Sequence, residues 1–342
     1  MNKLVETDRL FITEMTADMA MDVHKNSLDE DIRRFVPRCF HGAKKMKTVY
    51  ERDYTTYPRQ FKTYRWYKPL LVGLLFVVFY LLFASLVYLI TRLAFNTTVT
   101  VTGYDSLDLY SAAGTFFNCS VEAMYIPAFL LAALIVKDRP FSSYLSSMGG
   151  WRWKTFVKTL AAGFVIFGIP TIIRYLLHGK AADVRFTPGG LFLLILLMPL
   201  LCIAEELLYR SFITQTFSSW FRLPAAGLIV QTIAFAAVHP YNLTGVIGIA
   251  VSAVIYGLIS IFSRGIESSS ALHITNNLTE LIMGGLGFGV LTANQSVSSV
   301  LLNATFKILF LVFIIYADKR LHWFDEVQRD DVEPFNAKYA RK

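Results

Sequence analysis

The chain has 342 residues, of which 54% are hydrophobic and only 17% are charged. Soluble domains carry about 25% charged residues, so this composition argues against a soluble protein. The formal net charge of +8 comes with no compact basic segment containing interleaved aromatics, and we expect no nucleic-acid partner. The three cysteines form no CxxC pair, which argues against a disulfide framework and against a zinc ribbon.

The N-terminal segment, residues 1–68, precedes the first long apolar run and is predicted to be cytoplasmic. The run from Val5 to Met15 alternates like a short strand. Together with residues 26–37 it resembles the opening strand and helix of GNAT-type acetyltransferases. Nothing downstream supplies a glycine-rich acetyl-CoA loop, so we expect no acetyltransferase activity. Residues 38–68 are rich in Lys and Arg and are typical of a membrane-surface approach to a first span.

Apolar runs dominate the rest of the chain, and a membrane-spanning helix needs about 20 such residues. Eight candidate spans follow one another at residues 69–91, 118–136, 155–177, 187–209, 223–239, 243–262, 271–290 and 300–317. The fifth and seventh are short or rich in glycine and polar residues. Such segments persist in a membrane only where neighbouring helices shield them, which indicates that they line a site. The sequence therefore predicts an all-α, polytopic membrane helix bundle over residues 69–317 and a cytoplasmic tail over residues 318–342.

Basic residues predict how the bundle is oriented. They are concentrated in residues 38–68, in the loop after the second span with Lys137 and Arg139, and after the eighth span at Lys319 and Arg320. Lys and Arg accumulate in cytoplasmic loops of membrane proteins. We therefore expect a multi-pass cell-membrane protein, surrounded by lipid bilayer, with both termini in the cytoplasm.

Three charged residues lie in the apolar run of the fourth span. Glu205, Glu206 and Arg210 follow fifteen residues without a charge. One ionised residue at the centre of a membrane helix costs about 2.5–3.5 kcal/mol, so three within six residues call for a function. Glu206 and Arg210 are four apart with the acid first, which favours an ion pair. Adjacent helical residues point about 100° apart, so Glu205 lacks a partner on its own helix and is a candidate general base. A helix-tethering charge cluster is the alternative.

Two later spans carry the polar residues that could meet these carboxylates. His239 ends the fifth span just before Pro240, and His273 and Asn277 share one face of the seventh. Glu280 lies on nearly the same face. A histidine beside an asparagine can hold a polarised water or a developing oxyanion. As alternatives, His239 is a packing residue and the His273–Asn277 pair is a polar contact between helices. The span limits put the two histidines at opposite ends of their helices, so they meet only if the fifth span is tilted or begins deeper, or a helix is broken.

The motifs of other membrane proteases are absent from the sequence, because it contains no HExxH, no GxGD and no GxSG. A metal site remains open at this point, since Glu205, His239 and His273 could supply the three ligands of a catalytic zinc. Equally, Glu205 could activate water with help from His239 and without a metal.

Three short motifs occur in order on separate apolar segments. They are Glu205-Glu206-x-x-x-Arg210, Phe235-x-x-x-His239 and His273-x-x-x-Asn277. In this order they resemble the motifs of the CPBP family, the CAAX protease and bacteriocin-processing group of intramembrane proteases, also called the Abi family. The resemblance covers roughly residues 118–317. It implies hydrolysis of a peptide bond in a membrane-associated peptide or protein.

The resemblance also implies roles for the motif residues. Glu205 with His239 would activate the attacking water, and His273 with Asn277 would stabilise the oxyanion. The supporting residues are Glu206, Arg210 and Phe235, which would shape the site or engage the substrate. Early accounts of the family invoked a metal and later ones a glutamate-based mechanism. We favour the latter and expect no cofactor, with Zn²⁺ held by Glu205, His239 and His273 as the alternative.

A second class of function is a non-catalytic membrane scaffold or regulator, in bacteriocin immunity or signalling, that uses the same polar cluster to bind a partner. A transporter is a weaker third idea, because the sequence has no convincing internal repeat. Eukaryotic members of the family trim prenylated CAAX proteins, whereas bacterial members are linked to bacteriocin maturation, self-immunity and peptide signalling. Short loops and the GNAT-like segment favour a bacterial protein, so we assign no prenyl substrate.

Overall fold

The computed structural model describes residues 3–7, 10–13, 53–98, 108–179, 182–289, 292–325 and 330–340. The chain divides into two compact units, residues 1–51 and residues 52–342. In the first unit, β1 (Lys3–Thr7) pairs antiparallel with β2 (Leu10–Thr13), where the sequence predicted one alternating run. The helix of the GNAT-like segment falls on residues 26–37, outside the described residues, and that resemblance stays a prediction.

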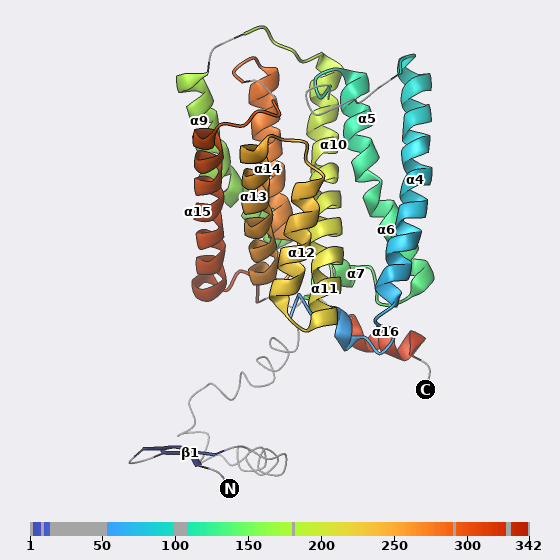
Figure 1. Ribbon diagram of the computed structural model, residues 1–342, viewed down its shortest axis with the longest axis vertical. Coiled ribbons are helices and arrows are strands. Elements are labelled where there is room, and N and C mark those ends of the chain that lie inside the picture. Colours follow the sequence, from blue (N-terminus) through green and yellow to red (C-terminus); the bar gives the residue numbers. More distant parts are fainter. Residues whose placement is uncertain are drawn as a thin grey trace. The chain divides into compact units, whose positions relative to one another are not determined.

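The second unit is a bundle of helices (Figure 1). In chain order its described helices are η1 (Tyr57–Gln60), α4 (Lys68–Phe95), α5 (Ala112–Ala123), α6 (Tyr125–Val136), α7 (Ser142–Leu145), α8 (Trp153–Gly163), η3 (Phe164–Gly168), α9 (Ile169–His178), α10 (Pro188–Glu206), η4 (Leu207–Ile213), α11 (Thr214–Phe221), α12 (Pro224–Ala237), α13 (Leu243–Ser263), α14 (Glu267–Gly285), α15 (Val297–Leu321) and α16 (Val332–Tyr339). The predicted all-α, polytopic helix bundle is confirmed.

Six helices in the described part of the chain are long and apolar enough to cross a membrane. They span Lys68–Phe95, Ala112–Val136, Trp153–His178, Pro188–Phe221, Leu243–Ser263 and Val297–Leu321. The other two predicted spans are helical as well, but α12 is a shorter apolar helix and α14 buries many polar side chains. These two are the segments whose composition predicted that they line a site.

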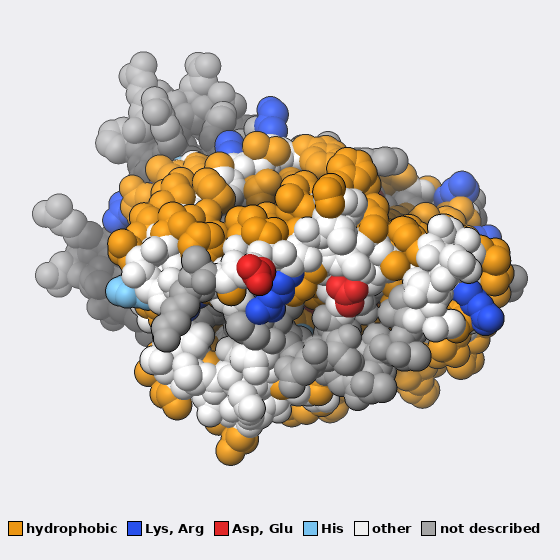
Figure 2. Space-filling view, turned by 90° about the horizontal axis from the view of Figure 1, so that it is seen from above, with side chains coloured by type: hydrophobic (Ala, Val, Ile, Leu, Met, Phe, Trp, Pro, Cys, Tyr) orange, Lys and Arg blue, Asp and Glu red, His pale blue; other side chains and the backbone are white. Residues whose placement is uncertain are grey.

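The outer surface of the bundle is suited to lipid. Large hydrophobic side chains on the peripheral helices are strongly exposed, with 74% of Leu93, 71% of Leu177 and 66% of Phe192 accessible. Figure 2, which views the bundle from the end where α10 begins, shows broad hydrophobic areas with only isolated charged side chains. Contiguous apolar surface on this scale marks a membrane interaction rather than contact with water.

The length of α12 decides how deep His239 lies. The helix begins at Pro224 and has 14 residues, which rise about 21 Å. This is less than the hydrocarbon core of a bilayer, about 30 Å thick. The helix ends at Ala237, so His239 lies inside the bundle and not at its outer end. A short helix is therefore the reason that the fifth and seventh spans can both reach one site.

The fourth span is a continuous helix from Pro188 to Phe221 whose middle is widened into the π-helical turns of η4. Thr187 caps its start by accepting a hydrogen bond from the Gly190 N–H. The π-helical turns begin directly after Glu206 and include Arg210. Such turns are rare and are frequent at functional sites, and here they coincide with the charged cluster.

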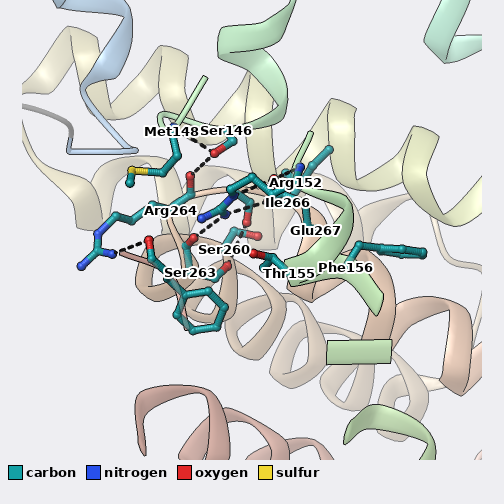
Figure 3. Close-up of polar contacts among 12 residues, drawn as sticks. Ser146, Met148, Arg152, Thr155, Phe156, Ser260, Ser263, Arg264, Ile266 and Glu267 are labelled. Carbon is teal, nitrogen blue, oxygen red and sulfur yellow. Dashed lines mark hydrogen bonds and ion pairs between the residues drawn. The ribbon is translucent and has the colours of Figure 1, made fainter. Parts of the chain in front are cut away.

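A buried ion pair fixes the start of α14 (Figure 3). Arg152, which precedes α8, donates from Nε to Glu267 Oε1 at 2.9 Å and from Nη2 to Glu267 Oε2 at 2.9 Å. Its Nη2 also donates to the Ser263 carbonyl at 2.6 Å. Ser146 and Gly265 form an isolated β-bridge beside this pair. The contacts tie the loop before α8 to the turn between α13 and α14, the helix that carries His273.

Replacing Gly265 with alanine is expected to destabilise this junction. A Cβ there would lie 2.3 Å from Glu267 Oε2 and 2.9 Å from Arg152 Nη2, so one partner of the buried pair must move. Overpacking costs 1–3 kcal/mol and a broken buried pair more, and we expect Gly265→Ala to lose about 3 kcal/mol of unfolding free energy. Denaturant titration in detergent micelles measures this. Gly73→Ala is the control, because its Cβ meets only the Phe212 ring at 3.4 Å. Equal stability of the two variants would contradict the account.

The segments that flank the bundle meet at one end of it. Tyr57 in η1 donates to Asp331, which precedes α16, and the Ser142 hydroxyl of α7 donates to the same carboxylate at 2.7 Å. The Lys62 N–H donates to Asn336 Oδ1 at 2.7 Å. Residues 53–67 and 330–340 therefore lie on the same side of the bundle. The predicted division of the chain into an N-terminal segment, a membrane domain and a C-terminal tail, with boundaries after residues 68 and 317, stays a prediction.

Candidate active site

A cavity of about 630 Å³ inside the bundle brings the predicted catalytic residues together. Its lining includes Glu205 from α10, His239 from the turn after α12, and His273 and Asn277 from α14. Phe235, a supporting residue, also lines it. Three segments far apart in the sequence thus contribute to one chamber, as the order of their motifs predicted.

Two carboxylates and a guanidinium share this chamber with His273. Glu206 Oε1 lies 3.2 Å from Arg210 Nη1, and both side chains are fully buried, so the predicted ion pair is present. His273 lies between the two glutamates, with Nδ1 3.0 Å from Glu206 Oε1 and Nε2 3.4 Å from Glu205 Oε2. Glu205 has no partner on its own helix, as expected, but it has one on α14. The sequence paired it with the other histidine.

The Arg210 guanidinium lies against aromatic rings. Its Cζ is 4.1 Å from the Phe235 ring centroid and 5.1 Å from that of Tyr256. A guanidinium over a desolvated aromatic face gains about 2 kcal/mol. Phe235 and Tyr256 therefore hold Arg210 beside Glu206. This gives the phenylalanine of the second motif a physical role in the site.

His239 has a defined tautomer when neutral. Its Nδ1 is 2.7 Å from the Phe235 carbonyl, which can only accept, so Nδ1 carries the proton and Nε2 is the acceptor. The Phe235 ring centroid is 4.5 Å from that of His239 and 6.3 Å from that of His273. Within the described ranges, no contact of 4.0 Å or less joins His239 to Glu205. The two face the same chamber without touching.

Asn277 keeps its amide donors largely free. Its Oδ1 accepts from Asn276 Nδ2 at 2.8 Å, and its Nδ2 lies 3.8 Å from Met198 Sδ. A thioether is a weak acceptor, so the amide N–H groups can still serve a stronger one. Asn276 Oδ1 in turn accepts from Asn303 Nδ2 at 3.2 Å. A chain of amides therefore runs from Asn277 to α15.

Three charged residues of the cavity complete its lining. Glu280, predicted to extend the polar face, lines the cavity but is held by Arg174 at 3.4 Å and by the Tyr175 hydroxyl. Glu122 on α5 and Lys307 on α15 also line it, and sequence reasoning missed both. The sequence alone could have identified both as candidates, because each is the single ionised residue inside its predicted span. An ionisable residue within a span is a functional candidate by default.

The alternative of a bound metal depends on how the His, Cys, Asp and Glu side chains are grouped. Among the residues that the structure describes, no three or more His, Cys, Asp or Glu side chains are grouped so that they could hold a metal ion. Both ring nitrogens of His273 already face carboxylate oxygens, and Nδ1 of His239 is bonded to a carbonyl. The ligand set Glu205, His239 and His273 therefore does not fit a three-ligand zinc centre in this arrangement.

A comparison with known protein families finds a match over the part of the chain that carries the three motifs. The family model described as type II CAAX prenyl endopeptidase Rce1-like matches residues 187–279. Residues 187–279 are therefore similar to an Rce1-like domain. This confirms the CPBP intramembrane protease family predicted from the motifs, all three of which lie inside the matched region. No curated protein and no solved structure matches the chain.

The Rce1-like domain covers the elements that build the chamber. It begins at the Thr187 cap of α10, contains η4, α11, α12 and α13, and ends on α14 two residues after Asn277. The matched region is shorter than the range of roughly residues 118–317 over which the sequence was expected to resemble the CPBP family. The family and the apolar helices together indicate a multi-pass membrane protein of a protease family.

Proposed function

We propose that the chain is an intramembrane endopeptidase of the CAAX protease and bacteriocin-processing type. It hydrolyses a peptide bond of a membrane-associated protein or peptide, using water activated by Glu205 with His239. The observation that carries this proposal is the convergence of the three motifs on one chamber inside an apolar bundle. Peptide hydrolysis needs a base, an oxyanion site and shelter from bulk water, and the chamber offers side chains for each.

Glu205 is proposed as the general base. Among the residues that the structure describes, it is the carboxylate of the pair without a guanidinium beside it, because Arg210 binds Glu206 instead. His239 contributes its Nε2 lone pair on the same chamber, where it accepts a hydrogen bond from the attacking water and orients it. Glu205 removes the proton of that water, and the water oxygen bonds to the carbonyl carbon of the substrate.

His273 and Asn277 are proposed to stabilise the resulting oxyanion. Donation from His273 Nε2 requires a proton on both ring nitrogens, because Glu206 already accepts from Nδ1. The cluster permits this. The carboxylates of Glu205 and Glu206 and the guanidinium of Arg210 sum to one negative charge. A second proton on the His273 ring makes the total charge of these four residues zero. Asn277 adds its amide N–H, whose acceptor among the described residues is the Met198 thioether.

The cleavage step then returns the proton. When the tetrahedral intermediate collapses, its C–N bond breaks and the protonated Glu205 donates to the leaving amine. Glu205 ends ionised, one water is consumed, and one carboxyl group and one amine are released. No metal ion is assigned to any step, and we propose that none is required.

We propose further that the protein lies in the cell membrane with both termini in the cytoplasm. Residues 53–67 and α16 meet at the same end of the bundle as α7, so the flanks of the bundle share one side. Lys and Arg are concentrated in these flanks, and such residues favour the cytoplasm.

Cleavage of a membrane-peptide library by the purified chain tests this function. We expect the wild-type chain to cleave, and cleavage to persist after a chelator is added. If a chelator abolished cleavage and zinc restored it, the base mechanism without a metal would be wrong. If the wild-type chain cleaved nothing, and Glu205→Gln still supported its cellular phenotype, the non-catalytic scaffold would replace the protease.

His239→Ala is expected to lower the cleavage rate about 100-fold without unfolding the chain. General acid–base residues contribute 10²- to 10⁴-fold, and here Glu205 remains to take the proton. Initial rates on one cleaved peptide measure the effect, and circular dichroism checks the fold. His178→Ala is the control, because that residue ends α9 and does not line the cavity. Equal rates for the two variants would remove His239 from the mechanism.

A further inference from the structure

A basic hollow lies where the chain enters its first membrane span. It has a volume of about 420 Å³ and is lined by Arg59, Phe61, Lys62, Tyr64, Arg65 and Trp66. The span itself, α4, begins at Lys68, and its first turns already expose Leu70 and Leu74 by 53% and 62%. The headgroup layer of a bilayer extends about 5–7 Å beyond the hydrocarbon core. The hollow therefore lies at the level of the lipid headgroups, and Figure 1 shows α4 beginning at the end of the bundle where α11 and α16 lie.

Three cationic side chains of the hollow have no acidic partner. Within the described ranges, no carboxylate oxygen lies within 4.0 Å of Arg59, Lys62 or Arg65. Arg59 Nη1 donates to the Ser219 carbonyl at 2.9 Å. Arg65 Nη1 donates to the carbonyls of Lys62 and Tyr64, at 2.9 and 2.8 Å. These acceptors are uncharged, and each guanidinium keeps further N–H groups for a ligand.

The wall of the hollow is held in place by neighbouring helices. Phe61 is 2% exposed, and its ring packs edge-on against Phe335 of α16 with the centroids 5.8 Å apart. The Lys62 N–H donates to Asn336 Oδ1 of the same helix at 2.7 Å. Backbone carbonyls hold both guanidiniums as well. The cations are thus positioned before a ligand arrives, which lowers the entropy that binding costs.

Aromatic side chains place one edge of the hollow against the membrane interface. Trp66 is 68% exposed and the adjacent Tyr67 is 45% exposed. The Trp66 carbonyl accepts from Trp220 Nε1 at 2.8 Å, and Phe221 beside that residue is 66% exposed. Trp and Tyr are enriched at the headgroup level of membranes. An acidic protein in water would match the cations but not these rings, whereas a phospholipid offers a phosphate and acyl chains together.

We propose that this hollow binds the headgroup of an anionic phospholipid. Arg59, Lys62 and Arg65 contact its phosphate oxygens, and Trp66 lies beside its glycerol and acyl chains. Planar guanidinium groups match the oxygens of a phosphate, and basic pockets on the cytoplasmic side of membrane proteins take such headgroups. Inorganic phosphate has the same oxygens but brings no apolar part to Trp66. The inference does not depend on the proposed hydrolysis.

Native mass spectrometry of the purified full chain tests this site. The chain is incubated in detergent with equimolar phosphatidylglycerol and phosphatidylcholine, and the lipids that remain bound are counted. Three cations near one headgroup predict at least about tenfold more retained phosphatidylglycerol than phosphatidylcholine. Inorganic phosphate at the same concentration is expected to leave the lipid bound. Equal retention of the two lipids would overturn the proposal, and so would displacement by phosphate, which would assign the hollow to the free anion.

Two double variants then locate the preference. Lys62→Gln, Arg65→Gln is expected to lower the retention of phosphatidylglycerol at least about tenfold. Lys319→Gln, Arg320→Gln is the matched control, because it removes one exposed lysine and one exposed arginine at the end of α15, outside the hollow, and it is expected to keep the preference. Equal losses in the two would show a general attraction to positive charge and overturn the site.

A single variant covers the case in which the first double variant does not fold. Arg59→Gln removes one cation from the opposite side of the sequence segment that forms the hollow. It is expected to lower the preference for phosphatidylglycerol about fivefold, and circular dichroism checks its fold. A preference that Arg59→Gln leaves at the wild-type value would exclude this hollow as the binding site.

Discussion

Replacing Glu205 with glutamine is expected to lower the rate of peptide hydrolysis at least about 1,000-fold. The amide has nearly the shape of the carboxylate but cannot take a proton from water, and general bases contribute up to about 10⁴-fold. The chamber keeps its Glu206–Arg210 pair, so the fold is expected to survive. Initial rates on a peptide identified from the library, compared with the wild-type chain in the same detergent, measure the loss.

Glu122→Gln is the matched variant for this experiment. Glu122 is a carboxylate of the same cavity on α5, and within the described ranges it has no ion-pair partner. We expect its amide variant to keep the hydrolysis rate within about tenfold, because it contacts neither histidine of the motifs. Comparable losses in both variants would mean that the negative charge of the cavity matters and that Glu205 is no specific base.

Removing Arg210 is expected to cause a large loss of stability. Arg210 and Glu206 are fully buried and paired, and breaking such a pair from one side leaves an uncompensated charge and costs 3–5 kcal/mol. His273 still contacts Glu206 and limits the loss. We therefore expect Arg210→Met to lower the free energy of unfolding by about 3 kcal/mol, measured by denaturant titration in detergent.

The double variant Glu206→Gln, Arg210→Met separates charge from packing. With both charges of the pair removed, neither partner is left as a buried ion without the other, and we expect most of the stability to return. Its activity is expected to stay low, because His273 loses the carboxylate that orients Nδ1. A double variant as unstable as Arg210→Met alone would show that the guanidinium acts through its packing on Phe235 and Tyr256 and not through its charge.

The sequence predicted the membrane bundle because apolar runs and their length need no tertiary information. The Glu206–Arg210 pair was predictable for a similar reason, since a spacing of four residues on a helix is a local relation. The segments that only partly fitted a span, α12 and α14, are those that line the cavity. The short length of α12 and the polar content of α14, which distinguish them from ordinary membrane spans, therefore gave the best indication of where the cavity lies.

Contacts between helices were harder to predict. The sequence placed His239 beside Glu205, whereas the contact within 4.0 Å is made by His273. That choice depends on the depth at which α12 ends and on the contacts that hold the start of α14, and neither is a local property. Lys307 and Glu122 were missed because a single charge in an apolar run has no motif, although its cost in the membrane already indicated a role.

The most direct test of the account is hydrolysis of a cleavable peptide in water labelled with ¹⁸O, by the purified full chain in proteoliposomes. Mass spectrometry then reads the isotope in the products. Water activated by Glu205 predicts one ¹⁸O atom in the new C-terminal carboxyl group with the wild-type chain and no cleavage product with Glu205→Gln. A wild-type chain that releases no product, or a Glu205→Gln chain that incorporates the label at the wild-type rate, would contradict this mechanism.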